Sequence, residues 1–156
     1  MSKTPAAWRL ILHHENVEKA LAWVREHKRI AIGWGEIGHV RASGLSSTDM
    51  IRQVIKNAYG ERLSGTNHSN GGRALYDFAY TMKPGDLVVL RGPGNRAVVR
   101  VRGEYEWAPV GEPVPSRDYN HQREIEFTNI DADSFWNERG GLGAGSRFCT
   151  LLPLAS

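Results

Sequence analysis

The sequence predicts a single α+β domain in which a small, strongly bent mixed β-sheet, or partial barrel, is flanked by helices. The chain has 156 residues, a length expected of one domain with one core. Apolar residues make up 40% and charged residues 24%, so a core can form and the charge is too low for a disordered chain. Helical patterns lie early and short strand patterns dominate after residue 86, an order typical of this class.

Amphipathic patterns in the first half predict a strand, a helix, a second strand and a second helix. The first strand covers residues 8–13, and the second covers 29–34 and ends in a glycine loop at 33–38. Asn16 caps the first helix, in which Val17, Ala20, Leu21 and Val24 share one face. Ser46 and Ser47 precede the second helix, and Gly60 ends it.

Residues 60–72 have no apolar periodicity, which predicts a mobile loop. A third helix then carries Leu75, Phe78, Ala79 and Met82 on one face, and Lys83-Pro84-Gly85-Asp86 forms a type II-like turn. After this turn the apolar period changes from helical to two. The later elements expected are strands at 87–91, 96–102, 104–107, 122–127 and 148–152, a hairpin turn at 92–95, a helical turn at 133–138, and loops at 109–115 and 140–145.

Charge and cysteine content limit the classes of function. The net charge of +3 and the pI near 9.2 are compatible with a phosphate-bearing partner, although many proteins without one have similar values. Cys149 is the single cysteine, which excludes an internal disulfide and a cysteine-rich metal site. We expect no cofactor and no membrane contact, because no stretch approaches the roughly 18 apolar residues of a membrane span. Residues 1–5 lack a signal-peptide pattern, so a cytoplasmic location is expected.

The sequence contains no common catalytic motif. The six histidines are scattered, without HExxH spacing, and neither GxSxG nor a Walker loop occurs. Residues 33–38 do fit the G-x-G-x-x-G pattern of dinucleotide-binding proteins. However, the bulky Trp34 occupies the turn that should approach a pyrophosphate, and no helix opens after Gly38. We therefore reject a dinucleotide site.

Trp34 is the strongest candidate for ligand binding. It lies in a loop at a strand end, flanked by Gly33 and Gly35, where an indole can project from the scaffold and a ligand can approach the backbone. Such a ring can serve as a stacking surface for a nucleobase. The alternative is that Trp34 covers the core, which is the commoner fate of a tryptophan.

Arginines along one predicted strand could bind phosphate. The period of two places Arg96, Arg100 and Arg102 on one face, while Ala97, Val99 and Val101 point to the other, and Arg91 lies across the hairpin. Guanidinium groups suit phosphate oxygens and set affinity and register without reading sequence. The alternative is an ordinary solvated face.

Further aromatic and amide side chains could enclose a base that is flipped out of a duplex. Such recognition needs rings against the two faces of the base and hydrogen-bonding groups at its edge. Besides Trp34, residues of suitable types are Tyr105, Tyr119, His121, Asn67 and Asn70. The sequence does not show that they converge.

Taken in order, several short runs resemble the EVE and YTH-like domains of the PUA-like superfamily. The runs are Trp8 in the first strand, Ile30-Ala31-Ile32-Gly33-Trp34, Phe78, Met82-Lys83-Pro84-Gly85-Asp86-Leu87-Val88-Val89, Val101-Arg102-Gly103-Glu104-Tyr105-Glu106, and His121-Gln122-Arg123-Glu124-Ile125-Glu126-Phe127. The chain looks most like the EVE-like modules that accompany prokaryotic type IV restriction and related defence nucleases. The resemblance extends from Trp8 to about Phe127.

The resemblance implies a pseudobarrel of five or six strands with flanking helices. It also implies a pocket for a flipped modified base, such as a methylated or hydroxymethylated cytosine or a methylated adenine. Trp34 is the first residue to carry over to that pocket, followed by Tyr105, His121 and Arg123. The chain departs from the family at His39, where an acidic residue is frequent, and at Phe127, where a tryptophan is frequent.

Three functions remain open from the sequence. The leading hypothesis is a reader of modified DNA that is not itself an enzyme, so that any cutting would need a nuclease partner. The second is an RNA-binding PUA-like domain, which would differ in its treatment of the 2′-hydroxyl. The third is a small-molecule or nucleotide-binding enzyme in which His121 acts with Glu124 or Asp86 as acid and base.

Overall fold

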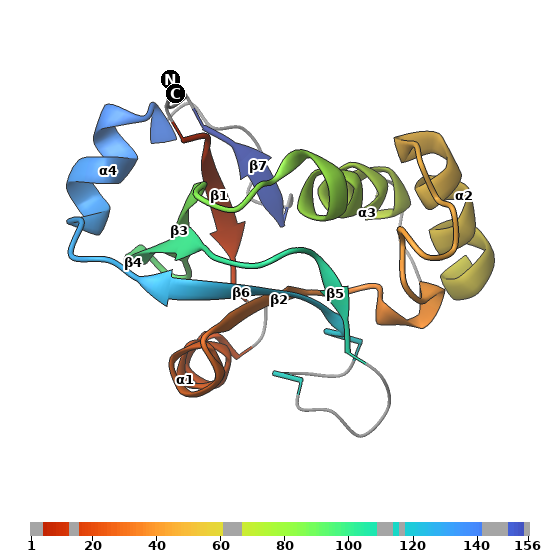
Figure 1. Ribbon diagram of the computed structural model, residues 1–156, viewed down its shortest axis with the longest axis horizontal. Coiled ribbons are helices and arrows are strands. Elements are labelled where there is room, and N and C mark those ends of the chain that lie inside the picture. Colours follow the sequence, from red (N-terminus) through yellow and green to blue (C-terminus); the bar gives the residue numbers. More distant parts are fainter. Residues whose placement is uncertain are drawn as a thin grey trace.

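The chain folds into a curled mixed sheet with helices packed at its sides (Figure 1), as a computed structural model describes it. The structure describes residues 5–12, 16–60, 67–108, 114–115, 118–141 and 150–154, with only the backbone at 67–70. The strands in these ranges are β1 (Ala7–Ile11), β2 (Arg29–Ile32), β3 (Leu87–Arg91), β4 (Asn95–Val101), β5 (Glu106–Trp107), β6 (His121–Phe127) and β7 (Leu151–Pro153). The predicted α+β class is confirmed.

The sheet has the strand order β2-β6-β4-β3-β1-β7, and β5 pairs with β6 outside this path. β1 and β3 are parallel, with Trp8 opposite Val88, and the other pairs are antiparallel. The hairpin of β3 and β4 lies where the change of period predicts it. The sheet has seven strands rather than the five or six expected from the resemblance, and two of them, β5 and β7, are very short.

The first two helices begin at the predicted caps. In α1 (Val17–His27) the Asn16 side chain accepts a hydrogen bond from the Lys19 amide at 3.1 Å. In α2 (Thr48–Tyr59) the Ser47 hydroxyl accepts one from the Met50 amide at 3.2 Å, and Gly60 ends the helix. Each cap satisfies an amide that has no partner within its helix, which is why these residue types mark helix starts.

The third helix is longer than predicted. α3 (Asn67–Tyr76) continues into η3 (Asp77–Thr81), a π-helical turn, so the predicted loop is wrong for residues 67–72, whereas 61–66 lie outside the described residues. A Cβ atom at Gly72 would lie 3.1 Å from the Thr48 carbonyl oxygen. The glycine that suggested a loop therefore allows α3 to approach α2 closely, and packing outweighs its poor helix propensity.

The sheet separates a large core from a small one. Alternate residues of β4 confirm the predicted period of two, since Val99 and Val101 join the large core beneath α1, α2 and α3. Val98 points to the other face, where it packs with Phe135 and Trp136 of α4 (Ala132–Glu138). Arg100 and Arg102 occur at the same alternation as Val98, so the predicted cationic face lies on the outer side of the large core.

The predicted turn after η3 is confirmed, and its last residue ties it to β1. The Asp86 amide donates to the Lys83 carbonyl at 3.0 Å, and Gly85 has a φ of 98°, as a type II turn requires. The buried Asp86 carboxylate accepts hydrogen bonds from Trp8 Nε1 at 3.0 Å and from the amides of Ala6 and Lys83. This carboxylate therefore holds the turn against the first strand.

Candidate functional site

Trp34 lies two residues after the end of β2 and occupies an unusual backbone conformation. Its φ of 65° and ψ of 33° place it in the left-handed region, which L-residues with bulky side chains rarely adopt. Residues in such conformations cost about 1–3 kcal/mol each and persist only where their surroundings hold them. The contacts around Trp34 show what holds this one.

A buried tyrosine and a buried histidine hold the Trp34 segment at both ends. The Trp34 carbonyl oxygen lies 2.9 Å from His121 Nε2, and His121 Nδ1 lies 2.7 Å from the Tyr105 hydroxyl. The same hydroxyl accepts a hydrogen bond from the Val40 amide at 3.0 Å. We call Tyr105, His121 and their bonds to Trp34 and Val40 the Tyr–His clamp.

The clamp requires one tautomer of a neutral imidazole. A carbonyl oxygen can only accept, so His121 Nε2 must donate to Trp34, which leaves Nδ1 to accept the Tyr105 proton. Burial lowers the pKa of His121 to about 4, so the ring is neutral near pH 7. Burial also raises the pKa of Tyr105, so its hydroxyl keeps the proton that it donates.

Further hydrogen bonds fix the turn after Trp34, which is the short 3₁₀ helix η1 (Gly35–Ile37). The Gly35 amide donates to the Asp118 carbonyl at 2.7 Å, and the Gly35 carbonyl accepts from Trp107 Nε1 at 3.0 Å. A Cβ atom at Gly35 would lie 2.6 Å from the Asp118 carbonyl oxygen, a backbone atom that cannot move aside, so only glycine fits there. The loop is therefore a rigid platform.

The Trp34 indole lies against α3 and is only partly buried. A Cβ atom at Gly71 would lie 2.7 Å from Trp34 Cε2 and 2.8 Å from Cζ2, so the ring fits where α3 lacks a side chain. Its accessibility is intermediate, and it packs at the margin of the large core. Trp34 thus falls between the two predicted alternatives, because it neither stands free nor lies in the interior.

Tyr119 is a second partly exposed ring close to this loop. Its Cε1 atom lies 3.5 Å from the position that a Cβ atom of Gly33 would take, so the ring packs on the residue that precedes Trp34. Of the residues predicted to surround a base, Trp34, Gly33, Gly35 and Tyr119 are brought together. The side chains of Asn67 and Asn70 lie outside those described, and their backbone forms the start of α3.

Arg123, Tyr105 and His121 are placed differently from the prediction that they line a base pocket. Arg123 is 0% exposed and donates to the carbonyls of Phe78 at 2.9 Å, Met82 at 2.6 Å and Gly103 at 2.9 Å. Its guanidinium thus satisfies carbonyl groups at the end of η3, where a cation is also favoured. Tyr105 and His121 are 4% and 0% exposed, so all three are internal groups in this structure.

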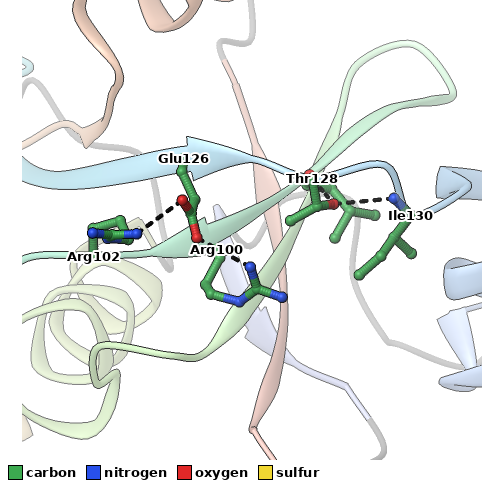
Figure 2. A network of polar contacts seen from close by, with 6 residues as sticks. Arg100, Arg102, Glu126, Thr128 and Ile130 are labelled. Atoms are coloured by element: carbon green, nitrogen blue, oxygen red, sulfur yellow. Dashed lines mark hydrogen bonds and ion pairs between the residues drawn. The ribbon is translucent and has the colours of Figure 1, made fainter.

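The four predicted phosphate-binding arginines do not form one cluster. Arg100 and Arg102 lie side by side and share Glu126, at 3.0 Å and 2.9 Å, as Figure 2 shows. Arg96 pairs with Glu18 at 2.7 Å, and Arg91 lies over the Trp136 ring with its Cζ atom 3.8 Å from the centroid. The cationic face is therefore reduced to Arg100 and Arg102, which are partly exposed.

The residues proposed as acid and base for an enzyme are not arranged for that role. Asp86 already accepts three hydrogen bonds, and His121 is bonded at both ring nitrogens. Glu124 is exposed and lies three residues from His121 on β6, so the two side chains point to opposite faces. Among the described residues, no three His, Cys, Asp or Glu side chains lie together so that they could hold a metal ion. The helices of the same residues are all too short or too polar to span a bilayer.

Sequence reasoning missed three residues that build this site, namely Gly71, Trp107 and Asp118. Gly71 could have been found, because apolar residues at helical spacing begin at Ala74 and Leu75, directly after the glycine pair, and permit a longer helix. Trp107 and Asp118 act on the Gly35 backbone, and a contact with a distant main-chain group leaves no local pattern.

The fold and the site together define an α+β protein with a curled mixed sheet and a rigid loop that presents a partly exposed tryptophan. The chain belongs to the family described as "Domain of unknown function (DUF8426)", whose model matches residues 8–138. No curated protein matches the sequence.

Proposed function

We propose that this protein is a nucleic-acid-binding module that recognises a modified base in DNA and stacks it on Trp34. We propose that its fold is the PUA-like fold of EVE and YTH-like domains. The curled seven-stranded sheet is compatible with the pseudobarrel of that fold. The base is a methylated or hydroxymethylated cytosine or a methylated adenine. Binding is its whole activity, and a nuclease partner would carry out any cutting.

The left-handed conformation of Trp34 is the observation that carries this proposal. A bulky side chain in that conformation costs free energy. Hydrogen bonds of the buried Tyr105 and His121 maintain it, as do the Trp107 indole and the close packing at Gly35. Stored backbone strain of this kind concentrates at ligand sites. The result is an aromatic ring that is fixed in place and still partly open to solvent, as base stacking requires.

The Arg100 and Arg102 pair supplies the phosphate contacts in this proposal. Both guanidinium groups are partly exposed, and their ion pairs with Glu126 are of a kind that contributes little free energy in water. A phosphate oxygen can therefore replace the carboxylate. β6 lies between β4, which carries Arg100, and β2, which leads to Trp34. Arg100 is opposite Glu126 near the end of β6, whereas Ile32 of β2 is opposite His121 at its start, so the arginines would meet phosphates at a distance from the stacked base.

A panel of oligonucleotide duplexes that differ in one base tests the proposal. The central base is cytosine, 5-methylcytosine, 5-hydroxymethylcytosine, adenine or N6-methyladenine, and fluorescence anisotropy gives each Kd. We expect tighter binding of one modified duplex, loss of that preference in Trp34→Ala, and partial retention in Trp34→Phe, which keeps a ring. An equal loss of affinity for modified and unmodified duplexes in Trp34→Ala would overturn the assignment.

Arg100→Ala tests the phosphate contact with the same probes. We expect weaker binding of every duplex and a shallower dependence of log Kd on log salt concentration, because phosphate contacts release counterions whatever the base. Arg25→Ala, at an exposed position of α1, is the matched control and should change neither quantity. Matched RNA probes identify the other outcome, since tighter binding of RNA would replace DNA with RNA as the ligand.

A further inference from the structure

We propose that Tyr105 and His121 are positioning residues, which fix the Trp34 ring in its binding geometry through the main chain and do not touch the ligand. For its ligand this inference rests on the proposed function, whereas the positioning itself can be measured without a ligand. This positioning role takes the place of the direct contact with a base that the family resemblance implies for Tyr105 and His121.

The clamp joins the two ends of one segment. His121 binds the carbonyl of Trp34 at 2.9 Å, Tyr105 binds the amide of Val40 at 3.0 Å, and the two side chains bind each other at 2.7 Å. The segment 34–40 is thereby closed into a loop by side chains from two other parts of the chain. A loop closed in this way restricts the backbone angles available to Trp34.

Packing around the Tyr105 ring fixes the position of its hydroxyl. The Tyr105 ring meets His39 and Phe78 edge-on, with centroid distances of 4.9 Å and 6.3 Å, and stacks on His121 at 5.8 Å. With the ring surrounded, the hydroxyl cannot turn toward solvent or toward a ligand. The two hydrogen bonds of the Tyr105 hydroxyl are also buried, so their loss is not compensated by water, whereas the bond from His121 to the Trp34 carbonyl is partly buried.

The clamp also determines where the Trp34 indole lies, because the position of the ring depends on the backbone conformation of Trp34. The Trp34 ring fits against Gly71 only when its backbone points it there, and the left-handed conformation does so. If the clamp is removed, Trp34 can relax toward the commoner regions of φ and ψ, and the ring then leaves Gly71. Ligand affinity is thus set in part by two residues that the ligand does not contact.

The ligand-free test follows the Trp34 indole by its ¹H–¹⁵N NMR cross-peak, which the variant Trp34→Phe identifies by its disappearance. In Tyr105→Phe we expect this cross-peak to shift or broaden, while those of Trp8, Trp23 and Trp136 keep their positions and report that the fold is intact. Tyr80→Phe is the matched control, because it also removes a hydroxyl that bonds the main chain, in this case by donating to the Leu45 carbonyl at 2.8 Å. It should leave the Trp34 cross-peak in place.

A pair of His121 variants separates hydrogen bonding from packing. Glutamine can donate and accept as the imidazole does, whereas leucine can do neither. We expect the Trp34 cross-peak of His121→Gln to lie closer to that of the wild-type protein than the cross-peak of His121→Leu does. A Trp34 cross-peak that stays in place in both Tyr105→Phe and His121→Leu would overturn the inference, as would equal displacement in the two His121 variants.

The binding measurement then links position to affinity. For the preferred modified duplex we expect Tyr105→Phe to raise Kd about tenfold, the equivalent of one lost hydrogen bond, while Tyr80→Phe leaves Kd unchanged. If the wild-type protein prefers no duplex in the panel, the proposed function fails, yet the spectra still decide the positioning role. If the cross-peak moves and Kd does not, the clamp fixes the ring without serving binding, and the inference is overturned.

Discussion

The Tyr–His clamp and the Arg100–Arg102 face use polar side chains in opposite ways. In the clamp, the Tyr105 and His121 side chains are buried and their polar atoms have fixed partners, so their hydrogen bonds determine one backbone geometry. On the arginine face, two partly exposed cations share a single carboxylate, that of Glu126. Water competes for these ion pairs more than for the clamp, in which both bonds of the Tyr105 hydroxyl are buried.

This difference separates positioning from binding. A buried group that loses its partner pays the full cost of desolvation, so the clamp resists rearrangement. An exposed ion pair contributes roughly 0–1 kcal/mol, so it can be exchanged for a phosphate at little cost. In the proposed function, the clamp holds the Trp34 ring in place, and Arg100 and Arg102 remain able to bind phosphate. The predictions below test whether buried and exposed polar groups differ as this contrast requires.

The largest effect is expected for Arg123→Met, at the most buried cation of the described residues. This variant keeps an unbranched apolar side chain in place of the aliphatic part of arginine but leaves the carbonyls of Phe78, Met82 and Gly103 without their donor. We expect the free energy of unfolding to fall by roughly 3–5 kcal/mol, as for other buried charge networks that lose a partner. Urea denaturation measures it, and Arg25→Met, which should stay within about 0.5 kcal/mol of wild type, is the control. A loss below 1 kcal/mol would mean that burial does not distinguish the two regions.

The next largest effect is the acid sensitivity of the clamp. His121 has a folded pKa of about 4 against an ordinary value of 6.5, so the unfolded chain binds a proton between these values and the folded protein does not. Its contribution to stability is therefore present above pH 6.5 and is lost as the pH falls toward 4, a change of about 3 kcal/mol. The difference in unfolding free energy between wild type and His121→Gln, measured from pH 4 to 7.5, should show this slope. Parallel pH profiles for the two proteins would count against a neutral, buried imidazole.

The contrast also explains which parts of the fold could be predicted from the sequence. Caps at Asn16 and Ser47, the turn at Gly85 and the alternation along β4 are local patterns, in which the side chain and its effect lie within a few residues. These features were predicted and are confirmed. The same locality explains why Trp34 could be chosen, since its glycine neighbours adjoin it in sequence.

The partners of buried polar groups could not be predicted in this way. Arg123 resembles a surface residue of an alternating strand, yet it is bonded to carbonyls more than 40 residues away in η3 and at Met82. The bonds of His121 to Trp34 and of Trp107 to Gly35 span similar or greater separations. Because such contacts depend on how distant segments meet, a single sequence carries no periodic signal for them. Hence the sequence predicts Tyr105, His121 and Arg123 as residues that line a base pocket, and it carries no sign of the internal hydrogen bonds that they make.

Gly71→Ala is expected to have a smaller effect, whose sign depends on Trp34. The added methyl group would lie within 3 Å of the indole, which should destabilise the protein by about 1–3 kcal/mol. In a Trp34→Ala background the nearest remaining atom is Ile55 Cδ1 at 3.1 Å, the far end of a side chain that can shift, so alanine should instead stabilise α3 by up to about 1 kcal/mol. Thermal and urea unfolding of the four proteins in this cycle measure both values. The same sign in both backgrounds would mean that the ring does not rest on Gly71.

The smallest change in stability is expected for Glu126→Gln, which sharpens the comparison from the exposed side. Arg100 lowers the pKa of Glu126, and Arg102 adds to this, so the carboxylate is ionised at neutral pH and its charge is the part that the variant removes. Because the ion pairs are exposed, the unfolding free energy should change little, as urea denaturation would measure.

Affinity should respond more than stability to Glu126→Gln, because a carboxylate that occupies two guanidinium groups competes with phosphate for them. For every duplex we expect Kd to fall by about threefold to tenfold at low salt, with a salt dependence steeper by roughly one unit. Glu138→Gln, an exposed position at the end of α4, controls for the change in net charge. An equal gain in that variant would show that overall charge is responsible. A gain confined to Glu126→Gln would mean that this carboxylate competes with phosphate for Arg100 and Arg102.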